Sequence, residues 1–392
     1  MSAAGHLIAS EDRRYLQNPY AGTPLHDRTV DLSQILGKVH NFLKHLAPIL
    51  RSELRSPGDN MNIYTGKVGS ALTLWRINTD FNSDDATLPE IVLPRHMPSR
   101  GHGIGFCSDS ICWELYQCLK TETPFAMNTE VYNNTADVSN EILFGRAGLA
   151  ILVDYFVKKG MRLTNRHLVS DILATISLTD YPWSWHNKVY FGAAHGTAGV
   201  LTTLKRLGEI SRPDLLSDLI IQSRLVTGNF RSSMGSNSDK LVQWCHGAPG
   251  FTALLLSFDQ NLADAAAPAV SSALDLKAII RDTADVIWQR GILRKGGSIC
   301  HGIAGNGYSF LSTYLHNRDE VYLWRAVCFA EIILSMGVTD CCASADHPLS
   351  LFEGVSGTAQ FLMDVAMVLK ARQNNEGVHF HSGDLLDGLS VF

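Results

Sequence analysis

Three short runs place histidine directly before glycine, and in two of them cysteine comes directly before the histidine. They are Ala194-His195-Gly196, Trp244-Cys245-His246-Gly247 and Ile299-Cys300-His301-Gly302. Two thiolates and one imidazole make a borderline-soft donor set that suits zinc, and three protein ligands leave a fourth tetrahedral position for water or substrate. If the runs occupy equivalent places in a repeated structure, their side chains converge and predict a catalytic zinc site. The alternative is that buried Cys and His only fill space at tight turns.

The three runs are copies of a longer repeat. Each copy contains Gly-x-x-Gly, and from the second recognisable copy onward the first glycines lie 51 to 55 residues apart. The first gap, of 79 residues, is wide enough to contain a degenerate copy, which we place at Phe106–Ser110. Seven repeats at this period predict an array rather than two or three separate domains. The first glycines of the six clear copies are Gly66, Gly145, Gly196, Gly247, Gly302 and Gly354.

The elements that must position these runs are helices. Apolar side chains at helical spacing follow the signatures, and further helical patterns lie between them, over residues 276–287 with Gly291 as the stop and 322–336 with Gly337 as the stop. Each repeat is therefore predicted to be a helical hairpin whose Gly-x-x-Gly begins the inner helix, because glycine removes side chains where helix ends crowd together. Periodicity alone leaves a closed ring and an open superhelix as alternatives.

Composition excludes several classes of protein. Of the 392 residues, 45% are hydrophobic, which supports a substantial core and argues against wholesale disorder. The chain has 33 basic and 38 acidic residues, a net charge of −5, so no nucleic-acid partner is expected. No run of about 18 apolar residues predicts a membrane-spanning helix. Peripheral membrane association stays open.

The compartment follows from the N-terminus and the cysteines. Residues 1–14 lack the apolar stretch of a signal peptide, so we expect the protein in the cytoplasm. In that reducing compartment, the cysteines near histidines are expected to be ligands or nucleophiles rather than disulfides.

The motifs resemble, in order, those of the lanthionine synthetase C-like family, and most closely its eukaryotic branch. They are His195-Gly196-x-Ala-Gly199, Trp244-Cys245-His246-Gly247-Ala-Pro-Gly250, Cys300-His301-Gly302-x-Ala-Gly305 and Ser350-Leu351-Phe352-Glu353-Gly354. The resemblance begins at Asn18-Pro19-Tyr20-Ala21 and covers nearly the whole chain. It implies an all-α fold, an α/α toroid of seven helical hairpin repeats.

The resemblance also implies the domain boundaries and the chemistry. Residues 1–392 would form a single domain, with a polar N-terminal extension over about 1–20 and a polar tail over about 373–392. Bacterial members join a cysteine thiol to dehydroalanine or dehydrobutyrine, which forms a thioether. Eukaryotic members bind glutathione and are implicated in adding it to dehydroamino acids in proteins.

Carried over residue by residue, the family's one zinc per chain would be held by Cys245, Cys300 and His301. The family's catalytic histidine falls on His195, which would deliver a proton to the α-carbon after thiol addition, since imidazole titrates near neutral pH. An acidic family position falls on Glu141, which would orient a histidine, accept the thiol proton or be only a helix-end carboxylate.

The expected glutathione contacts are Lys295 and Asp346. An arginine expected near Cys342 or Ala343 is missing, and the loop before Ser350 is one residue longer than the family pattern. His246 is expected either behind the zinc ligands or against the substrate.

Two further positions, Arg146 and Leu241, carry separate expectations. Arg146 is expected to pair with Glu141 or Glu353. The bacterial cyclases carry an arginine where this chain has Leu241, so their mechanism does not transfer whole.

The predicted function is therefore a zinc-dependent glutathione transferase, a thioether-forming enzyme that adds the glutathione thiol to electrophiles such as dehydroamino-acid-containing peptides or proteins. The alternative is a non-catalytic glutathione-binding signalling adaptor that keeps a structural zinc. The complete set of His195, Cys245, Cys300 and His301 favours the enzyme, and the altered loop before Ser350 favours the adaptor.

Overall fold

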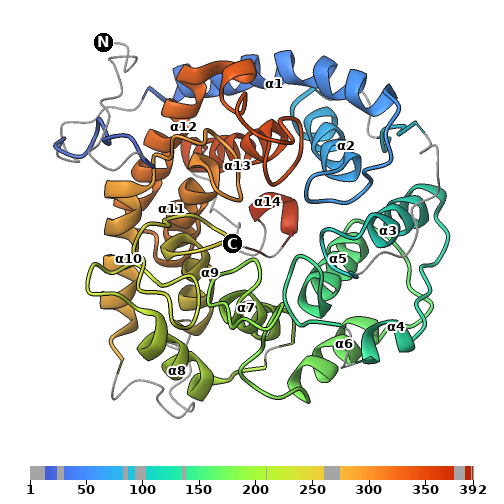
Figure 1. The fold of residues 1–392 in the computed structure, drawn as a ribbon. Helices are drawn as coiled ribbons and strands as arrows, with labels where there is room; N and C mark the ends of the chain where they lie inside the picture. Colours follow the sequence, from blue (N-terminus) through green and yellow to red (C-terminus); the bar gives the residue numbers. More distant parts are fainter. Residues whose placement is uncertain are drawn as a thin grey trace. The chain divides into compact units, whose positions relative to one another are not determined.

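A computed structural model describes most of the chain in two compact units (Figure 1). The first unit comprises residues 1–98 and 288–387, and the second comprises 99–287 and 388–392. The described residues are 14–23, 31–82, 87–92, 103–134, 138–208, 210–259, 274–374, 385–389 and 391. The proposed N-terminal extension and C-terminal tail lie mostly outside them.

The regular structure of the described residues is helical. These residues also form isolated β-bridges, but none of them forms a β-strand. The first unit holds α1 (Leu32–Arg55), α2 (Lys67–Arg76), the π-helical turn η2 (Ile77–Asn82), α11 (Ile303–Asn317), α12 (Glu320–Asp340), α13 (Val355–Gln373) and α14 (Leu385–Gly388, which ends at the boundary). The second holds α3 (Asp109–Thr121), α4 (Glu130–Asn133), α5 (Arg146–Lys158), α6 (Leu168–Ser177), α7 (Thr197–Gly208), α8 (Pro213–Ser223), α9 (Ala248–Asp259) and most of α10 (Leu276–Arg290). The all-α prediction is confirmed.

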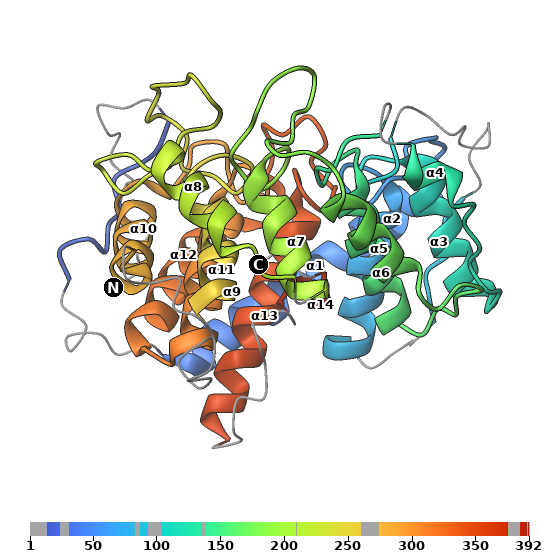
Figure 2. The same cartoon turned by 90° about the horizontal axis from the view of Figure 1, so that it is seen from below.

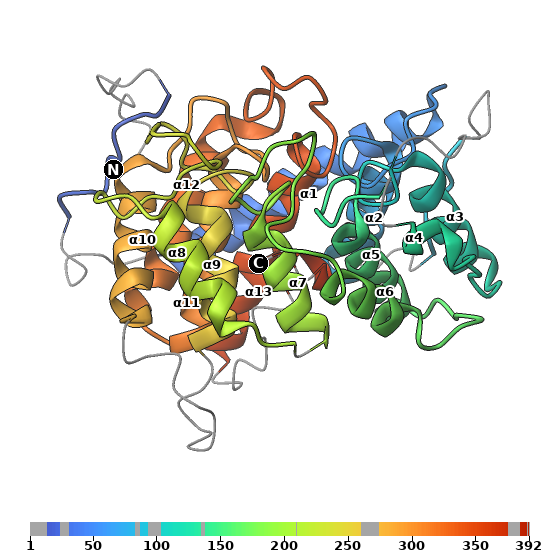
Figure 3. The same cartoon turned by 60° about the horizontal axis from the view of Figure 1, so that its bottom comes forward.

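Seven helices begin at the seven predicted signatures. Six start directly after the first glycine of a Gly-x-x-Gly, and α3 starts after Ser108 in the degenerate copy. These inner helices are α2, α3, α5, α7, α9, α11 and α13. The helices between them are less regular, since α4 has only four residues. Within the second unit α5 packs against both α6 and α7, as Figures 2 and 3 show.

The second glycine of each Gly-x-x-Gly signature is required for a steric reason. A Cβ placed on it would lie 1.8 to 2.3 Å from the backbone carbonyl oxygen six residues earlier, in all six clear copies. Any side chain would therefore separate the entering loop from the first turn of the inner helix. The glycines are Gly69, Gly148, Gly199, Gly250, Gly305 and Gly357.

In the first unit the last repeat contacts the first one. Cys300 N donates to Phe352 O at 2.7 Å, which joins the sixth signature to the seventh, and Phe352 N donates to Tyr64 O at 3.0 Å, which joins the seventh to the first. Inner helices α13 and α2 also pack on each other. Within this unit the seventh repeat therefore contacts both the sixth repeat and the first one.

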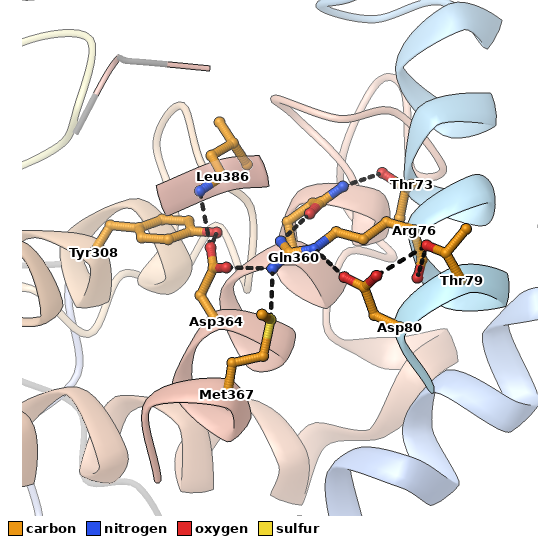
Figure 4. A network of polar contacts seen from close by, with 9 residues as sticks. All are labelled: Thr73, Arg76, Thr79, Asp80, Tyr308, Gln360, Asp364, Met367 and Leu386. Atoms are coloured by element: carbon orange, nitrogen blue, oxygen red, sulfur yellow. Dashed lines mark hydrogen bonds and ion pairs between the residues drawn. The ribbon is translucent and has the colours of Figure 1, made fainter. Parts of the chain in front are cut away.

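A buried polar network reinforces this junction (Figure 4). Asp364 on α13 forms an ion pair with Arg76 on α2 at 2.5 Å, and both side chains are at most 6% exposed. The same carboxylate accepts from the Tyr308 hydroxyl at 2.6 Å and from Leu386 N at 2.8 Å. Arg76 also donates to Gln360 at 2.6 Å. The network therefore ties α2, α11, α13 and α14 together.

One described helix corrects the sequence analysis. By length and composition α12 is apolar enough to cross a bilayer, although no such helix was expected. Its composition has another explanation, because half of its apolar window is buried and it packs against α1, α11 and α13. Gly337, predicted as the stop of this helix, has φ of 77° and breaks it there. Gly291 likewise follows the end of α10, as predicted.

Candidate functional site

The second unit brings Glu141 and His195 together. Glu141 lies in the loop that enters α5, and His195 lies directly before the glycine that begins α7. His195 Nδ1 is 2.8 Å from Glu141 Oε2, although the residues are 54 positions apart. An ionised carboxylate can only accept hydrogen bonds, so His195 Nδ1 carries the hydrogen of this bond. The second ring nitrogen, Nε2, is therefore available to another partner. Glu141 therefore contacts and orients His195, which is one of the roles that the sequence left open.

The Glu141 carboxylate is held on every side. Its side chain is 3% exposed, and it accepts from the backbone N–H groups of Leu143 at 2.8 Å and Phe144 at 2.5 Å. The Ser139 hydroxyl donates to it at 3.2 Å. These donors offset the cost of burying a charge, so the carboxylate stays in place as a fixed acceptor.

Arg146 does not pair with Glu141 or Glu353, and that prediction is wrong. Its fully buried guanidinium donates to the carbonyl oxygens of Tyr132 at 2.6 Å and Asn134 at 2.8 Å, and to the Asn140 side chain at 2.9 Å. Burial among neutral acceptors lowers the pKa of Arg146 to about 10. Arg146 thus stabilises the loop that leads into Glu141.

Aromatic rings surround His195. The Trp185 indole stacks on the imidazole with centroids 3.8 Å apart and planes 8° apart. The Phe144 ring lies 6.2 Å away and is nearly parallel, at 4°. Tyr190 is tilted against the imidazole at 5.8 Å. With 15% of its side chain exposed, His195 is enclosed but still accessible.

Cys245 and His246 also lie in the second unit. The Gln243 side-chain amide donates to Cys245 Sγ at 3.0 Å. The His246 ring lies against Tyr190, with ring centroids 5.8 Å apart and planes tilted by 38°. Burial, with smaller contributions from His195 and Lys188, lowers the pKa of His246 to about 4, so this imidazole is neutral at pH 7. His246 therefore belongs to the surroundings of His195.

The first unit contains Cys300 and His301. The Tyr64 hydroxyl donates to Cys300 Sγ at 2.6 Å, and its ring stacks on Phe352 at 4.7 Å. Burial, and then the positive charge of Lys295, lower the pKa of His301 to about 4, while Asp346 acts in the opposite direction. The two predicted glutathione contacts are thus both electrostatic neighbours of His301, and both are exposed to solvent.

A family model for lanthionine synthetase C-like proteins matches residues 110–371, which is more than half of the chain. The chain belongs to the lanthionine synthetase C-like family. The match covers His195, Cys245, Cys300 and His301, so all four lie within the region that defines the family.

Relatives carry two kinds of name. The chain is 31% identical over 231 residues to a zebrafish (Danio rerio) protein named glutathione S-transferase LANCL1, covering 56% of this chain and 52% of that one. It is 30% identical over 250 residues to the Arabidopsis thaliana LanC-like protein GCL1, covering 58% and 55%. The matched part spans about half the length of these relatives. Among solved structures, nisin cyclase aligns over 92% of this chain and 98% of its own, with 13% identity and a TM-score of 0.47.

The zinc set stays a prediction. Cys245 belongs to the second unit, and Cys300 and His301 belong to the first. Among the described residues, no group of three or more His, Cys, Asp or Glu is arranged to hold a metal.

Sequence reasoning missed several neighbours of the predicted residues. Tyr64 stands two positions before its signature glycine, the register that Cys245 and Cys300 hold in their own copies. Aligning the repeats could therefore have found Tyr64. Nothing in the pattern points to Trp185, which lies in the irregular loop between α6 and α7.

Proposed function

We propose that this protein is a zinc-dependent glutathione transferase that adds the glutathione thiol to α,β-unsaturated amides such as dehydroalanine or dehydrobutyrine residues. The observation that carries the proposal is the Glu141–His195 pair, in which a buried carboxylate fixes an accessible imidazole. The name of one relative, glutathione S-transferase LANCL1, supports glutathione as the thiol substrate.

Cys245, Cys300 and His301 would hold the zinc. Their chemistry fits the ion, because two cysteine sulfurs and one imidazole make a borderline-soft donor set, and each sulfur has a hydrogen-bond donor beside it. The lowered pKa of His301 keeps its imidazole unprotonated at neutral pH, as a ligand must be. When bound, zinc supplies the positive charge that removes the proton of an incoming thiol near pH 7.

His195 acts after the carbon–sulfur bond forms. Thiolate attack on the β-carbon moves the electron pair of the double bond to the α-carbon and the adjacent carbonyl. The α-carbon then needs one proton, and His195 Nε2 donates it while Nδ1 stays bonded to Glu141. Glu141 stabilises the positive imidazolium before the transfer and fixes its direction. The thiol and the alkene combine without loss of atoms, and solvent returns the proton to His195.

Lys295 and Asp346 would bind glutathione at its charged ends. Lys295 suits a carboxylate of glutathione, and Asp346 suits its amino group. Both side chains are exposed, and both charges act on the His301 imidazole. Lys295 and Asp346 are therefore neighbours of His301, one of the proposed zinc-binding residues.

The test is adduct formation. The full chain, its zinc content measured, is incubated with glutathione and a dehydroalanine peptide, and the thioether product is followed by mass spectrometry. We expect product with wild type and none above the uncatalysed rate with His195→Ala. Equal rates with the two proteins would refute the mechanism. Glutathione binding without product would instead identify the adaptor, which the altered loop at 343–346 favours.

A further inference from the structure

Trp185 lies on a tight hairpin in the loop between α6 and α7. Trp185 N donates to Lys188 O at 3.0 Å, and Lys188 N donates back to Trp185 O at 3.1 Å. The two residues between them, His186 and Asn187, have φ of 49° and 58°. Two consecutive left-handed residues are what a two-residue type I′ turn requires. The turn therefore fixes the direction in which the Trp185 side chain leaves the backbone.

The base of the hairpin is anchored to a second segment of the chain. Phe191 N donates to Ser232 O at 3.0 Å, and Met234 N donates to Val189 O at 2.9 Å. The segment that leaves the hairpin toward His195 is thus bonded to residues 232–234, and the hairpin is a built part of the second unit rather than an isolated surface turn.

Two contacts together define the orientation of the His195 ring. The Glu141 carboxylate holds one atom, Nδ1, at 2.8 Å, but one hydrogen bond leaves the ring free to tilt about it. The Trp185 indole, at 3.8 Å and 8°, fixes the plane. An imidazole with one atom and its plane fixed points Nε2 in a single direction.

We propose that Trp185 is a positioning residue for His195: the hairpin presses the indole face on the imidazole so that Nε2 is aimed at the α-carbon that receives the proton. This inference rests on the proposed function, because it takes His195 as the proton donor. Proton delivery to carbon depends on direction, and small misplacements of a reacting group cost up to about a hundredfold in rate.

Substitutions at Trp185 test the stacking itself. Trp185→Leu removes the flat face but keeps apolar bulk, and Trp185→Phe restores a smaller face. With Trp185→Leu we expect kcat for adduct formation to fall by about tenfold to a hundredfold, with KM for glutathione within about twofold of wild type. Trp185→Phe should recover most of kcat. An unchanged kcat in Trp185→Leu, or a change in KM alone, would overturn the proposal.

Substitutions at Asn187 test the hairpin without altering any aromatic ring. Asn187→Gly keeps the left-handed turn and should leave kcat unchanged, whereas the β-branched side chain of Asn187→Val does not tolerate φ of 58° and should lower kcat as Trp185→Leu does. Equal activity of these two variants would show that the turn does not position Trp185.

A spectroscopic readout separates this inference from the proposed function. In protein labelled with 13C at histidine Cε1, the His195 signal is identified by its loss in His195→Gln. A stacked indole shields the His195 ring proton, so we expect an upfield shift in wild type that disappears in Trp185→Leu. If wild type forms no adduct, the proposed function fails, and the shift still decides whether Trp185 orients His195. A His195 shift that is the same in wild type and in Trp185→Leu would refute the proposal that Trp185 orients the His195 ring.

Discussion

Replacing Glu141 with glutamine keeps the shape of the side chain and removes its charge. Glu141 Oε2 accepts from His195 Nδ1 and Leu143 N, each at 2.8 Å, and Oε1 accepts from Phe144 N at 2.5 Å and the Ser139 hydroxyl at 3.2 Å. Glutamine offers one acceptor oxygen, so its NH2 group must face one of the two backbone N–H donors. At least one buried N–H then loses its partner, at a cost of about 1–3 kcal/mol of stability.

The effect on rate should exceed the effect on stability. Without the carboxylate, the imidazolium form of His195 loses the adjacent negative charge, and this is the form that donates the proton. In the Ser-His-Asp triad of serine proteases, the comparable Asp→Asn change lowers kcat by about 10⁴. Because His195 here needs only the orientation and charge of Glu141, we expect a fall in kcat of about 10² to 10⁴.

The assay is the initial rate of thioether formation, with the melting temperature of each variant measured in parallel. Ser139→Ala is the matched control, because it removes a contact to the same carboxylate without changing its charge, and its rate should stay within about threefold of wild type. If Glu141 works through His195, adding Glu141→Gln to His195→Ala should lower the rate no further. A folded Glu141→Gln variant with less than a tenfold loss, or a fully additive double variant, would refute the reasoning.

Three other perturbations have defined outcomes. Cys300→Ala should reduce zinc, measured by elemental analysis, from about one ion per chain to a small fraction, because only two protein ligands are left. Asp364→Asn removes the buried countercharge of Arg76 and leaves only the more exposed Asp80, so we expect stability to fall by an amount near the lower end of about 3–5 kcal/mol, with a melting temperature lower by several degrees. Burial raises the pKa of Glu53 above its usual 4.5, so its contribution to stability is complete below that value and is lost as pH rises through the folded pKa. Glu53→Gln should therefore raise the melting temperature at pH 7 and leave it unchanged at pH 4.

Each of these has a control and a contradicting result. Cys328→Ala changes a buried cysteine outside the signatures and should keep its zinc, so equal metal content in both cysteine variants would remove the zinc assignment. Asp80→Asn alters a more exposed partner of Arg76 and should cost far less than Asp364→Asn. A Glu53→Gln variant that is stabilised equally at both pH values would contradict the titration argument.

Part of the site was readable because it repeats. His195 stands one position before a signature glycine, and Cys245 and Cys300 stand two positions before theirs. Matching places in a repeat predict matching places at the starts of the inner helices. Tyr64 obeys the same register and was overlooked only because tyrosine is not a zinc ligand. The prediction for Arg146 was wrong for a different reason. The sequence suggested a carboxylate partner, but carbonyl oxygens of the nearby loop accept the hydrogen bonds of the guanidinium, so no carboxylate is needed.

The sequence by itself determined the helices and where they begin. Both signals are local. Helical periodicity is visible within a few turns of sequence, and the second signature glycine is required because a carbonyl oxygen only six residues earlier lies against it. Only the tertiary structure decided which distant groups meet. Glu141 reaches His195 across 54 positions, Tyr64 reaches Cys300 across 236, and Arg76 reaches Asp364 across 288. Such contacts depend on how helices pack and on the direction in which each loop turns, as in the turn of residues 185–188 that carries Trp185. No periodicity along the chain encodes that direction, because it is set by atoms that are neighbours only after folding.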